Sequence, residues 1–163
     1  MQRKAAIRLA NDADSGQIAS LIAACWVAYP GCILDIDGEE PVLRAVASGF
    51  AARGGYFWAA CEGDWVVGSI GLVPAGEQAL AELVKLYVHP RRRRQGLARR
   101  LTALAEQTAR DEGCRRLELW SDTRFREAHA FYKAIGYTQT GQVRDLHDRS
   151  QSSEYRFVKD LDG

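Results

Sequence analysis

Apolar residues are spaced along the chain in two ways, and each spacing predicts one kind of secondary structure. Recurrence every three or four residues, as at Ile18, Leu21 and Ile22, predicts an amphipathic helix, whereas short β-rich runs bounded by Gly, Pro or Asp predict strands. The helical segments are 14–29, 42–53, 96–112 and 126–136. The strand segments are 5–12, 56–62, 65–74, 79–88, 115–121, 137–143 and 154–160, with a tight hairpin turn at Gly63-Asp64.

The order of these elements is β-α-α-β-β-β-α-β-α-β-β, which predicts a mixed α/β fold. The chain has 163 residues, 47% of them apolar, with no internal repeat and no linker-like segment. This length and composition suit one hydrophobic core. We therefore expect a single domain over residues 1–163, with a central twisted mixed sheet of about seven strands and about four helices (α+β).

Charge and cysteine content argue against several classes of protein. Lys and Arg total 22 against 21 Asp and Glu, so the whole chain is not built to bind polyanions and we expect no nucleic acid partner. The longest apolar run, Leu21 to Tyr29, is too short to cross a bilayer, so we expect a soluble, cytoplasmic protein with no membrane partner. The spacing of cysteines and histidines favours free thiols and no metal site.

Four consecutive arginines, Arg91 to Arg94, stand between a strand that ends at Val88-His89-Pro90 and a helix that begins near Gly96. The backbone N–H groups of such a loop are unpaired and point along the dipole of the new helix, so the loop is suited to bind an anion. Gly96 has no Cβ and lets a pyrophosphate approach the backbone. For some of these arginines the alternative, a solvated charge run, is the better interpretation.

The same segment carries a known motif. Val88, Pro90, Arg93, Gly96 and Ala98 form V-x-P-x-x-R-x-x-G-x-A, which resembles the acetyl-coenzyme A (acetyl-CoA) signature of the GCN5-related N-acetyltransferases, the GNAT superfamily. The sequences AELVKLYVHP and AHAFYKAIGY are similar to two further elements of that family, and the predicted order of elements agrees over nearly the whole chain. The chain departs from the family pattern at two positions.

Many family members have Gly where this chain has Arg94, and many have Asn where this chain has Phe125. The first difference concerns the backbone path of the loop. The second concerns local hydrogen bonding on the acceptor side.

The resemblance implies that acetyl-CoA lies between the strands 79–88 and 116–120, with its pyrophosphate on the loop. The implied cofactor contacts are Leu86, Tyr87, Val88, Arg93, Arg94, Gln95, Gly96, Leu97, Ala98 and Arg99. A backbone N–H of the first strand, such as that of Leu86, is the natural donor to an oxyanion. Arg93 occupies the motif position, and another arginine would meet the ribose 3′-phosphate.

Two side chains are candidates for proton transfer. Tyr132 matches the tyrosine that the family places near the cofactor sulfur, where a phenol can protonate a departing thiolate; the alternative is a packing tyrosine. Glu82 stands in the same alternating row as Val84, where a carboxylate is out of character, and matches a general base of some members. The alternatives are an ordinary polar residue at a strand start and a base that acts through a water relay.

The acceptor of a GNAT enzyme usually enters between the region that joins the first two helices and the last hairpin. The joining region here is acidic, with Asp35, Asp37, Glu39 and Glu40, and these carboxylates could attract a cationic amine. The alternative is a solubilising loop in which Asp37 caps the second helix. Arg144 and Ser152 are candidate polar contacts on the opposite wall.

The leading hypothesis is an N-acetyltransferase that moves an acetyl group from acetyl-CoA to a primary amine by direct attack in a ternary complex. The acceptor is expected to be a small molecule. The alternatives are a peptide or protein amine, at an N-terminus or a lysine, and a non-catalytic acyl-CoA-binding domain. A monomer and a homodimer are both compatible with the sequence.

Overall fold

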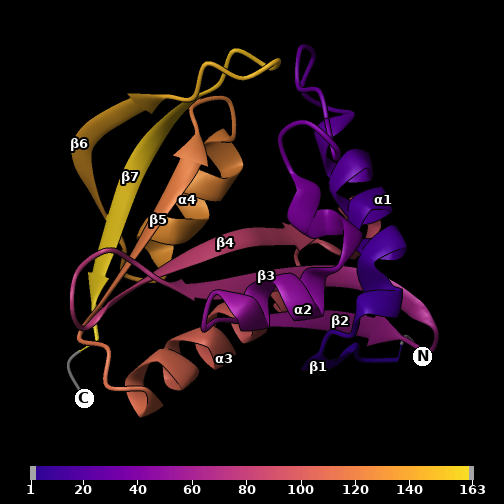
Figure 1. The fold of residues 1–163 in the computed structure, drawn as a ribbon, viewed down its shortest axis with the longest axis horizontal. Helices are drawn as coiled ribbons and strands as arrows, with labels where there is room; N and C mark the ends of the chain where they lie inside the picture. The colour runs from indigo at the N-terminus through magenta and orange to yellow at the C-terminus, as the bar shows by residue number, and fades with distance from the viewer. Residues whose placement is uncertain (1–2, 162–163) are drawn as a thin grey trace.

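The protein, described over residues 3–161 in a computed structural model, is built on one seven-stranded sheet (Figure 1). The strands are β1 (Ala6–Leu9), β2 (Tyr56–Glu62), β3 (Trp65–Pro74), β4 (Leu80–Val88), β5 (Arg116–Asp122), β6 (Thr138–Asp145) and β7 (Ser153–Asp160). Their order in the sheet is β1-β2-β3-β4-β5-β7-β6, and β4 with β5 is a parallel pair. This confirms the predicted mixed sheet and fold class.

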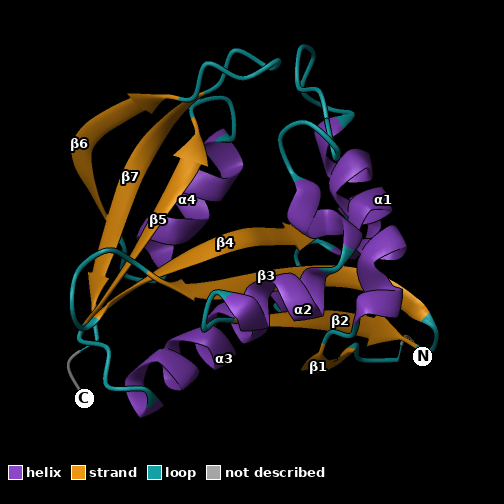
Figure 2. Ribbon diagram, in the orientation of Figure 1, coloured by secondary structure: helices purple, strands orange, loops and turns teal. Residues whose placement is uncertain are grey.

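Helices cover both faces of the sheet (Figure 2). They are α1 (Ser15–Trp26), α2 (Val46–Ala52), α3 (Leu97–Asp111) and α4 (Arg126–Ala134), with 3-10 turns at Asp12–Asp14, Pro41–Arg44 and Pro90–Arg92. The helices α1 and α2 bury one core against the sheet, around Ile18 and Phe50. A second core, around Leu101 and Phe157, lies under α3 and α4. None of the helices within residues 3–161 has the length and apolarity to cross a bilayer.

Two helix boundaries differ from the sequence prediction by three or more residues. The first helix ends at Trp26, three residues before the predicted end at Tyr29, and a turn continues the chain to Pro30. The second helix begins at Val46, because Pro41–Arg44 forms a 3-10 turn and Ala45 leaves the helical region with φ −152°. The spacing of apolar residues does not distinguish a 3-10 turn from the helix that follows it, so the sequence predicted one continuous helix over both.

The parallel pair β4–β5 separates halfway along its length, which opens the sheet. Leu80–Leu83 pair with Arg116–Leu119, but beyond these residues β4 pairs only with β3 and β5 only with β7. The ladder between β3 and β4 is also interrupted, because Lys85 and Leu86 together face the single residue Ile70. This bulge leaves backbone polar groups without a ladder partner at the edge of the opening.

Candidate functional site

A cavity of about 700 Å³ occupies the opening between β4 and β5. Its wall runs from the β4–α3 loop, along residues 82–88 of β4 and 119–122 of β5, to two loops at the far end. Those loops are 27–40, between α1 and the second 3-10 turn, and 146–152, between β6 and β7 (Figure 1). Every cofactor contact implied by the sequence motif except Gln95 lines this cavity.

The β4–α3 loop presents a run of unpaired backbone amides. The N–H of Arg91 donates to His89 Nδ1 at 3.2 Å and that of Arg92 to the His89 carbonyl at 2.8 Å. From Arg93 to Arg99, in contrast, no backbone N–H has an acceptor among residues 3–161. Gly96, the N-cap residue just before α3, has φ 78°, a left-handed conformation that glycine adopts at little cost. The unpaired amides and the positive end of the α3 dipole therefore lie together at one end of the cavity.

The arginines of the loop differ in their partners. Arg92 is paired with Glu62 on β2, and Arg93 Nε lies 3.4 Å from the Val88 carbonyl at the end of β4. Arg94 and Arg99 line the cavity and have no ion-pair partner in the part of the chain that the structure describes. Arg94 has φ 62°, in the left-handed region, at the position where many family members carry glycine. The loop thus keeps the backbone path that glycine would favour.

Tyr132 reaches the cavity from α4. The residue is 8% exposed, and its ring packs against Phe157, with 5.6 Å between ring centroids, and against Tyr137. Its hydroxyl has no hydrogen-bond partner within residues 3–161, yet no buried side-chain oxygen there is left unpaired, so the hydroxyl opens onto the cavity. Burial raises the pKa of Tyr132, so the phenol carries its proton at neutral pH.

Glu82 lies on β4, on the face opposite α3, and its side chain also lines the cavity. No hydrogen bond or ion pair to its carboxylate is found within residues 3–161. Burial raises the pKa of Glu82, the nearby Arg144 opposes this shift, and the charges of Glu118 and Glu154 add to it. Glu82 is therefore a proton acceptor of more than ordinary basicity.

The acidic residues of the loop 27–40 are mostly engaged in contacts within the protein. Asp37 pairs with Arg44 at 2.7 Å on the surface, and it caps neither the 3-10 turn nor α2. Asp35 Oδ1 accepts from the Gly38 N–H at 3.0 Å, and Glu39 Oε2 accepts from the Arg149 N–H at 2.9 Å. These three residues lie outside the cavity lining. Glu40 does line it, and its carboxylate is bound to Lys85 Nζ at 2.6 Å.

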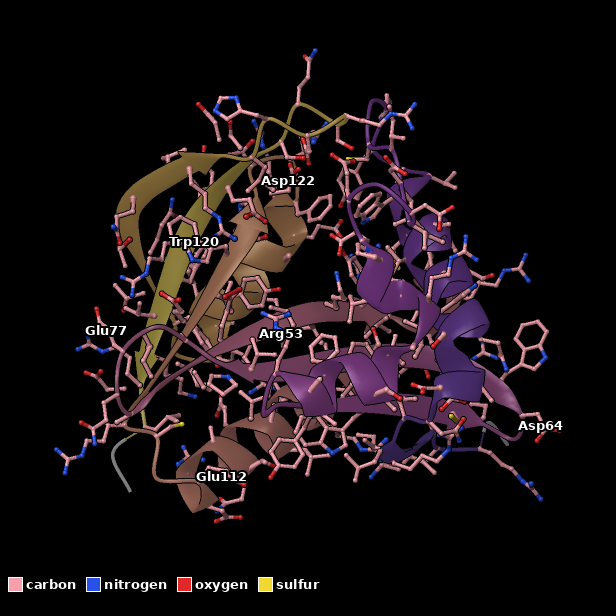
Figure 3. The ribbon with its side chains drawn as sticks, viewed as in Figure 1. Arg53, Asp64, Glu77, Glu112, Trp120 and Asp122 are labelled. Atoms are coloured by element: carbon pink, nitrogen blue, oxygen red, sulfur yellow. The ribbon has the colours of Figure 1, made fainter. Side chains whose placement is uncertain are left out.

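The opposite wall contains an arginine on an aromatic face. The guanidinium of Arg144, on β6, lies 4.2 Å from the ring centroid of Trp120 and pairs with Glu154 at 2.8 Å. Figure 3 labels Trp120 and Asp122 on β5, where the strand borders the opening. Ser152 is buried and accepts a hydrogen bond from Arg124 at 3.2 Å. Arg144 and Ser152 both line the cavity.

Four contacts join the loops at the far end of the cavity, and we call them the clasp. The Ile33 N–H donates to Ser150 Oγ at 2.7 Å, and Ser150 Oγ donates back to the Ile33 carbonyl at 3.1 Å. The Arg149 N–H donates to Glu39, and the Arg149 guanidinium lies 3.7 Å from Asp35. Ser150 is buried and lines the cavity. The clasp therefore ties together the two loops that form one part of the cavity wall, and Ser150 brings it to the cavity lining.

Sequence reasoning missed the clasp, Trp120 and a contact between Trp26 Nε1 and the Tyr87 hydroxyl at 3.2 Å. The two partners of each clasp contact are more than 100 positions apart, and Trp26 and Tyr87 are 61 apart. No local pattern links such residues. The one available signal was the Trp120 side chain on a strand that the motif placed beside the cofactor.

Comparison with known proteins agrees with this architecture. The sequence matches the model of the Acetyltransferase (GNAT) family over residues 18–137. Human N-acetyltransferase 8 is 36% identical over 121 residues, which cover 72% of this chain and 52% of that protein. The chain thus spans about half the length of the curated relatives it matches.

Solved structures share the whole fold. An acetyltransferase of the GNAT family from Staphylococcus aureus Mu50 has a TM-score of 0.84 at 19% identity, over 97% of this chain and 99% of that chain. YncA from Salmonella typhimurium, solved with its cofactor acetyl-CoA, has a TM-score of 0.72 at 20% identity, over 98% and 95%. The match to the family model covers well over half of the 163 residues. The chain therefore belongs to the acetyltransferase (GNAT) family.

Proposed function

We propose that this chain is an N-acetyltransferase that takes its acetyl group from acetyl-CoA and gives it to a small primary amine. One observation carries the proposal: the cavity between β4 and β5 is lined by unpaired loop amides and by two proton-transfer groups, Tyr132 and Glu82, that lack partners within residues 3–161. The family membership and the acetyl-CoA bound to YncA support the same donor.

The loop end fits the phosphates of acetyl-CoA. A Cβ placed at Gly96 would meet no protein atom within 4 Å, so the space above the glycine is open. The unpaired amides of 93–99 lie on both sides of Gly96 in the sequence, and the guanidiniums of Arg94 and Arg99, which have no ion-pair partner within residues 3–161, add positive charge. A pyrophosphate there would receive backbone hydrogen bonds, the α3 dipole and charge neutralisation together.

The middle of the cavity supplies the proton transfers that amide formation needs. An alkylamine is protonated at neutral pH, because its pKa is roughly 10, and it must lose a proton before it can attack. Glu82 accepts that proton, directly or through water, and passes it to solvent; it then takes the second proton that the nitrogen loses as the tetrahedral intermediate collapses to the amide. An N–H at the Lys85–Leu86 bulge donates to the carbonyl oxygen as negative charge develops on it. Tyr132 then gives its proton to the departing thiolate.

The far end of the cavity favours a small acceptor. The clasp joins the loops 27–40 and 146–152 across it, and Ser150 of the clasp is buried. A lysine on a folded protein would have to displace this cover, whereas a small amine fits beneath it. Trp120 and the pair Tyr29–Phe125, with 4.6 Å between ring centroids, supply apolar walls for its carbon skeleton.

The test is release of free thiol from acetyl-CoA in the presence of a panel of amines. The panel contains small alkylamines and arylalkylamines, free amino acids, and peptides with a free N-terminus or an internal lysine. We expect turnover with at least one small amine and much slower turnover with the peptides. Binding of acetyl-CoA without thiol release from any amine would instead identify a non-catalytic acyl-CoA-binding domain, and faster turnover with peptides would refute the small acceptor.

A further inference from the structure

A buried network of charges and hydrogen bonds joins α3, the chain just after α4, and β7. Its members are Glu106 of α3, Tyr137 immediately before β6, and Lys159 of β7, and none of them lines the cavity. Lys159 Nζ lies 3.1 Å from both carboxylate oxygens of Glu106, and the Tyr137 hydroxyl donates to Glu106 Oε1 at 3.0 Å. We call these three residues the anchor. The proposed mechanism gives none of them a role.

The anchor holds the end of α4, the helix that carries Tyr132. The Tyr137 N–H donates to the Tyr132 carbonyl at 2.9 Å, which is the longer-range bond of a Schellman cap. Gly136 makes the left-handed turn that this cap requires, with φ 101°. Lys159 Nζ donates to the Ile135 carbonyl at 2.9 Å, in the same turn. The last turn of α4 is therefore fixed both to its own continuation and to β7.

The position of the Tyr132 ring depends on its neighbours. Its hydroxyl has no hydrogen-bond partner within residues 3–161, so no described contact holds the tip of the side chain. The ring meets that of Tyr137 edge-on, with 6.1 Å between centroids and 65° between the ring planes. The ring of Tyr137 is held in turn by its bond to Glu106. The anchor thus contacts Tyr132 through one main-chain hydrogen bond and one ring contact.

The charges of the anchor are a poor source of stability. The side chain of Glu106 is 9% exposed and that of Lys159 is 23% exposed. The cost of removing two charges from water offsets much of their attraction, and apolar residues of similar volume often give an equally stable protein. Burial raises the pKa of Tyr137, and the charge of Glu106 raises it further, so this phenol stays a donor at neutral pH. What the anchor adds is a set of directional contacts among α3, α4 and β7.

We propose that the anchor is a positioning unit for the proton transfer by Tyr132. Such a transfer needs the two heavy atoms within about 2.6–3.2 Å, and a displacement of about 1 Å can cost about 100-fold in rate. The helix α3 presents unpaired amides at its N-terminal end and carries Glu106 farther along. By joining α3 to the end of α4, the anchor fixes the Tyr132 hydroxyl relative to the loop that would hold the phosphates, and so relative to the sulfur of the same cofactor. The proposal rests on the proposed function, since it concerns one step of that reaction.

A variant with an apolar anchor separates positioning from stability. Glu106→Leu, Tyr137→Phe and Lys159→Met together remove both charges and the hydroxyl at similar volume, so the midpoint of denaturant unfolding should stay close to that of the unmodified protein. We expect kcat to fall about 10-fold, while the dissociation constant of acetyl-CoA changes less than about twofold. In a Tyr132→Phe background the same three changes should leave kcat unchanged, because the hydroxyl that they position is absent.

Tyr137→Phe alone is the milder variant and serves if the triple variant does not fold. It removes the bond to Glu106 but keeps the ring and the main-chain bond to Tyr132, so we expect kcat to fall about threefold. Tyr56→Phe is the matched control. The Tyr56 hydroxyl bonds to Glu112 at the end of α3 (Figure 3), outside the cavity, and its ring stacks on a residue other than Tyr132. Its loss should not change kcat.

A measurement without turnover follows the ring of Tyr132 directly. 3,5-Difluorotyrosine incorporated at position 132 reports the surroundings of the ring through its ¹⁹F NMR signal. In the protein bound to coenzyme A we expect a narrow signal, which should shift and broaden in the triple variant and, to a smaller extent, in Tyr137→Phe. Tyr56→Phe should leave the signal as it is.

An equal fall in kcat with and without the Tyr132 hydroxyl would overturn the proposal, because the anchor would then act on the fold as a whole. A folded triple variant with unchanged kcat and an unchanged ¹⁹F signal would overturn it as well. If only Tyr137→Phe folds, the same two criteria apply to that variant. Failure of the proposed function is a different result, since the unmodified protein would then release no thiol with any amine while the ¹⁹F signal could still be measured.

Discussion

The two ends of the cavity are built in different ways. At the β4–α3 end, where we propose that the phosphates bind, the available groups are main-chain amides of consecutive residues, 93–99, in one loop and the first turn of one helix. At the other end, where we propose that the acceptor binds, the contacts come from side chains and loops that are far apart in sequence: Ser150 meets Ile33 across 117 positions and Lys85 meets Glu40 across 45. One end depends on local backbone conformation and the other on tertiary packing.

This difference indicates which end can change most easily. Amides keep their positions as long as φ and ψ do, so most side chains of the loop can vary without loss of the anion site. At the proposed acceptor end each of the contacts described above depends on at least one specific side chain, so replacing that side chain removes the contact. We infer that the donor is fixed by the fold and the acceptor is set by the loops 27–40 and 146–152.

Tyr132 stands between the two ends, and its removal should have the largest effect. Tyr132→Phe keeps the ring against Phe157 but removes the proton for the thiolate, so we expect kcat to fall about 100-fold. The dissociation constants of acetyl-CoA and of the acceptor should stay within about twofold, because neither end is altered. Steady-state kinetics and calorimetric titration measure these quantities. Unchanged kcat at saturating substrates would leave Tyr132 as a packing residue only.

Gly96→Val should weaken acetyl-CoA binding at the amide end of the cavity and leave the acceptor end unchanged. The branched side chain is placed in open space above the loop, at φ 78°, so it strains the backbone and occupies the proposed phosphate position. We expect acetyl-CoA affinity to fall about 30-fold, equivalent to about 2 kcal/mol, with little change in kcat at saturation. Gly113→Val is the matched control, because Gly113 has φ 85° and open space but lies outside this cavity. Equal losses in both variants would mean that strain, and not the phosphate site, is responsible.

Glu82→Gln should act at the acceptor end through pH. Activity needs the carboxylate form, and burial raises the pKa of Glu82, so kcat/KM should decline as pH falls through a value above the ordinary glutamate pKa of roughly 4.3. The Gln variant should lose about 10-fold in kcat/KM at neutral pH and should lack this acid limb. Glu118→Gln should retain the limb and move it to lower pH, because the Glu118 charge raises the pKa of Glu82. If Glu82→Gln showed the same acid limb in kcat/KM as the unmodified protein, another group would have to be the base.

Ser150→Ala should weaken the clasp, so it should change the selectivity for the acceptor and not the affinity for acetyl-CoA. The variant loses both hydrogen bonds to Ile33, and each is worth about 1 kcal/mol. We expect the ratio of kcat/KM for bulky amines to that for small amines to rise about threefold, while acetyl-CoA affinity stays the same. Ser153→Ala, which removes a bond to Asp145 outside the clasp, should not change the ratio. A fall in both rates with no change in their ratio would contradict a role in acceptor size.

The sequence predicted the parts of the molecule that depend on local patterns. Strand and helix order, the Gly63-Asp64 turn and the fold class were confirmed. The unpaired amides could be predicted because a strand end, Pro90 and a helix start near Gly96 leave no partner for them. Tyr132 and Glu82 were found through a motif and an out-of-place carboxylate, and their roles stay predictions.

The acceptor wall could not be predicted, because its partners are set by folding. The acidic run 35–40 suggested an amine site, but Asp37 bonds Arg44 and Glu39 bonds Arg149, and neither lines the cavity. A charge pattern does not reveal which arginine a carboxylate will meet. The contact between Trp26 and Tyr87 was unpredictable for the same reason. Tyr87 lies inside the motif, but its hydroxyl accepts a hydrogen bond from Trp26, which is 61 positions away.

Arg94→Gly should have the smallest effect and tests the backbone character of the amide end most directly. Arg94 has φ 62°, where a residue with a Cβ pays roughly 1 kcal/mol, so glycine relieves strain in the folded loop while it adds freedom to the unfolded chain. The variant also loses one guanidinium from the phosphate end. We expect acetyl-CoA affinity to change by less than about threefold, with a weaker dependence on salt, since amides do most of the binding and one charge is gone. Arg99→Ala, which removes a charge without touching a left-handed residue, should show the same change in salt dependence. A loss of affinity as large as that of Gly96→Val would move the anion site from the main chain to the guanidinium, and the two ends of the cavity would then both depend on side chains.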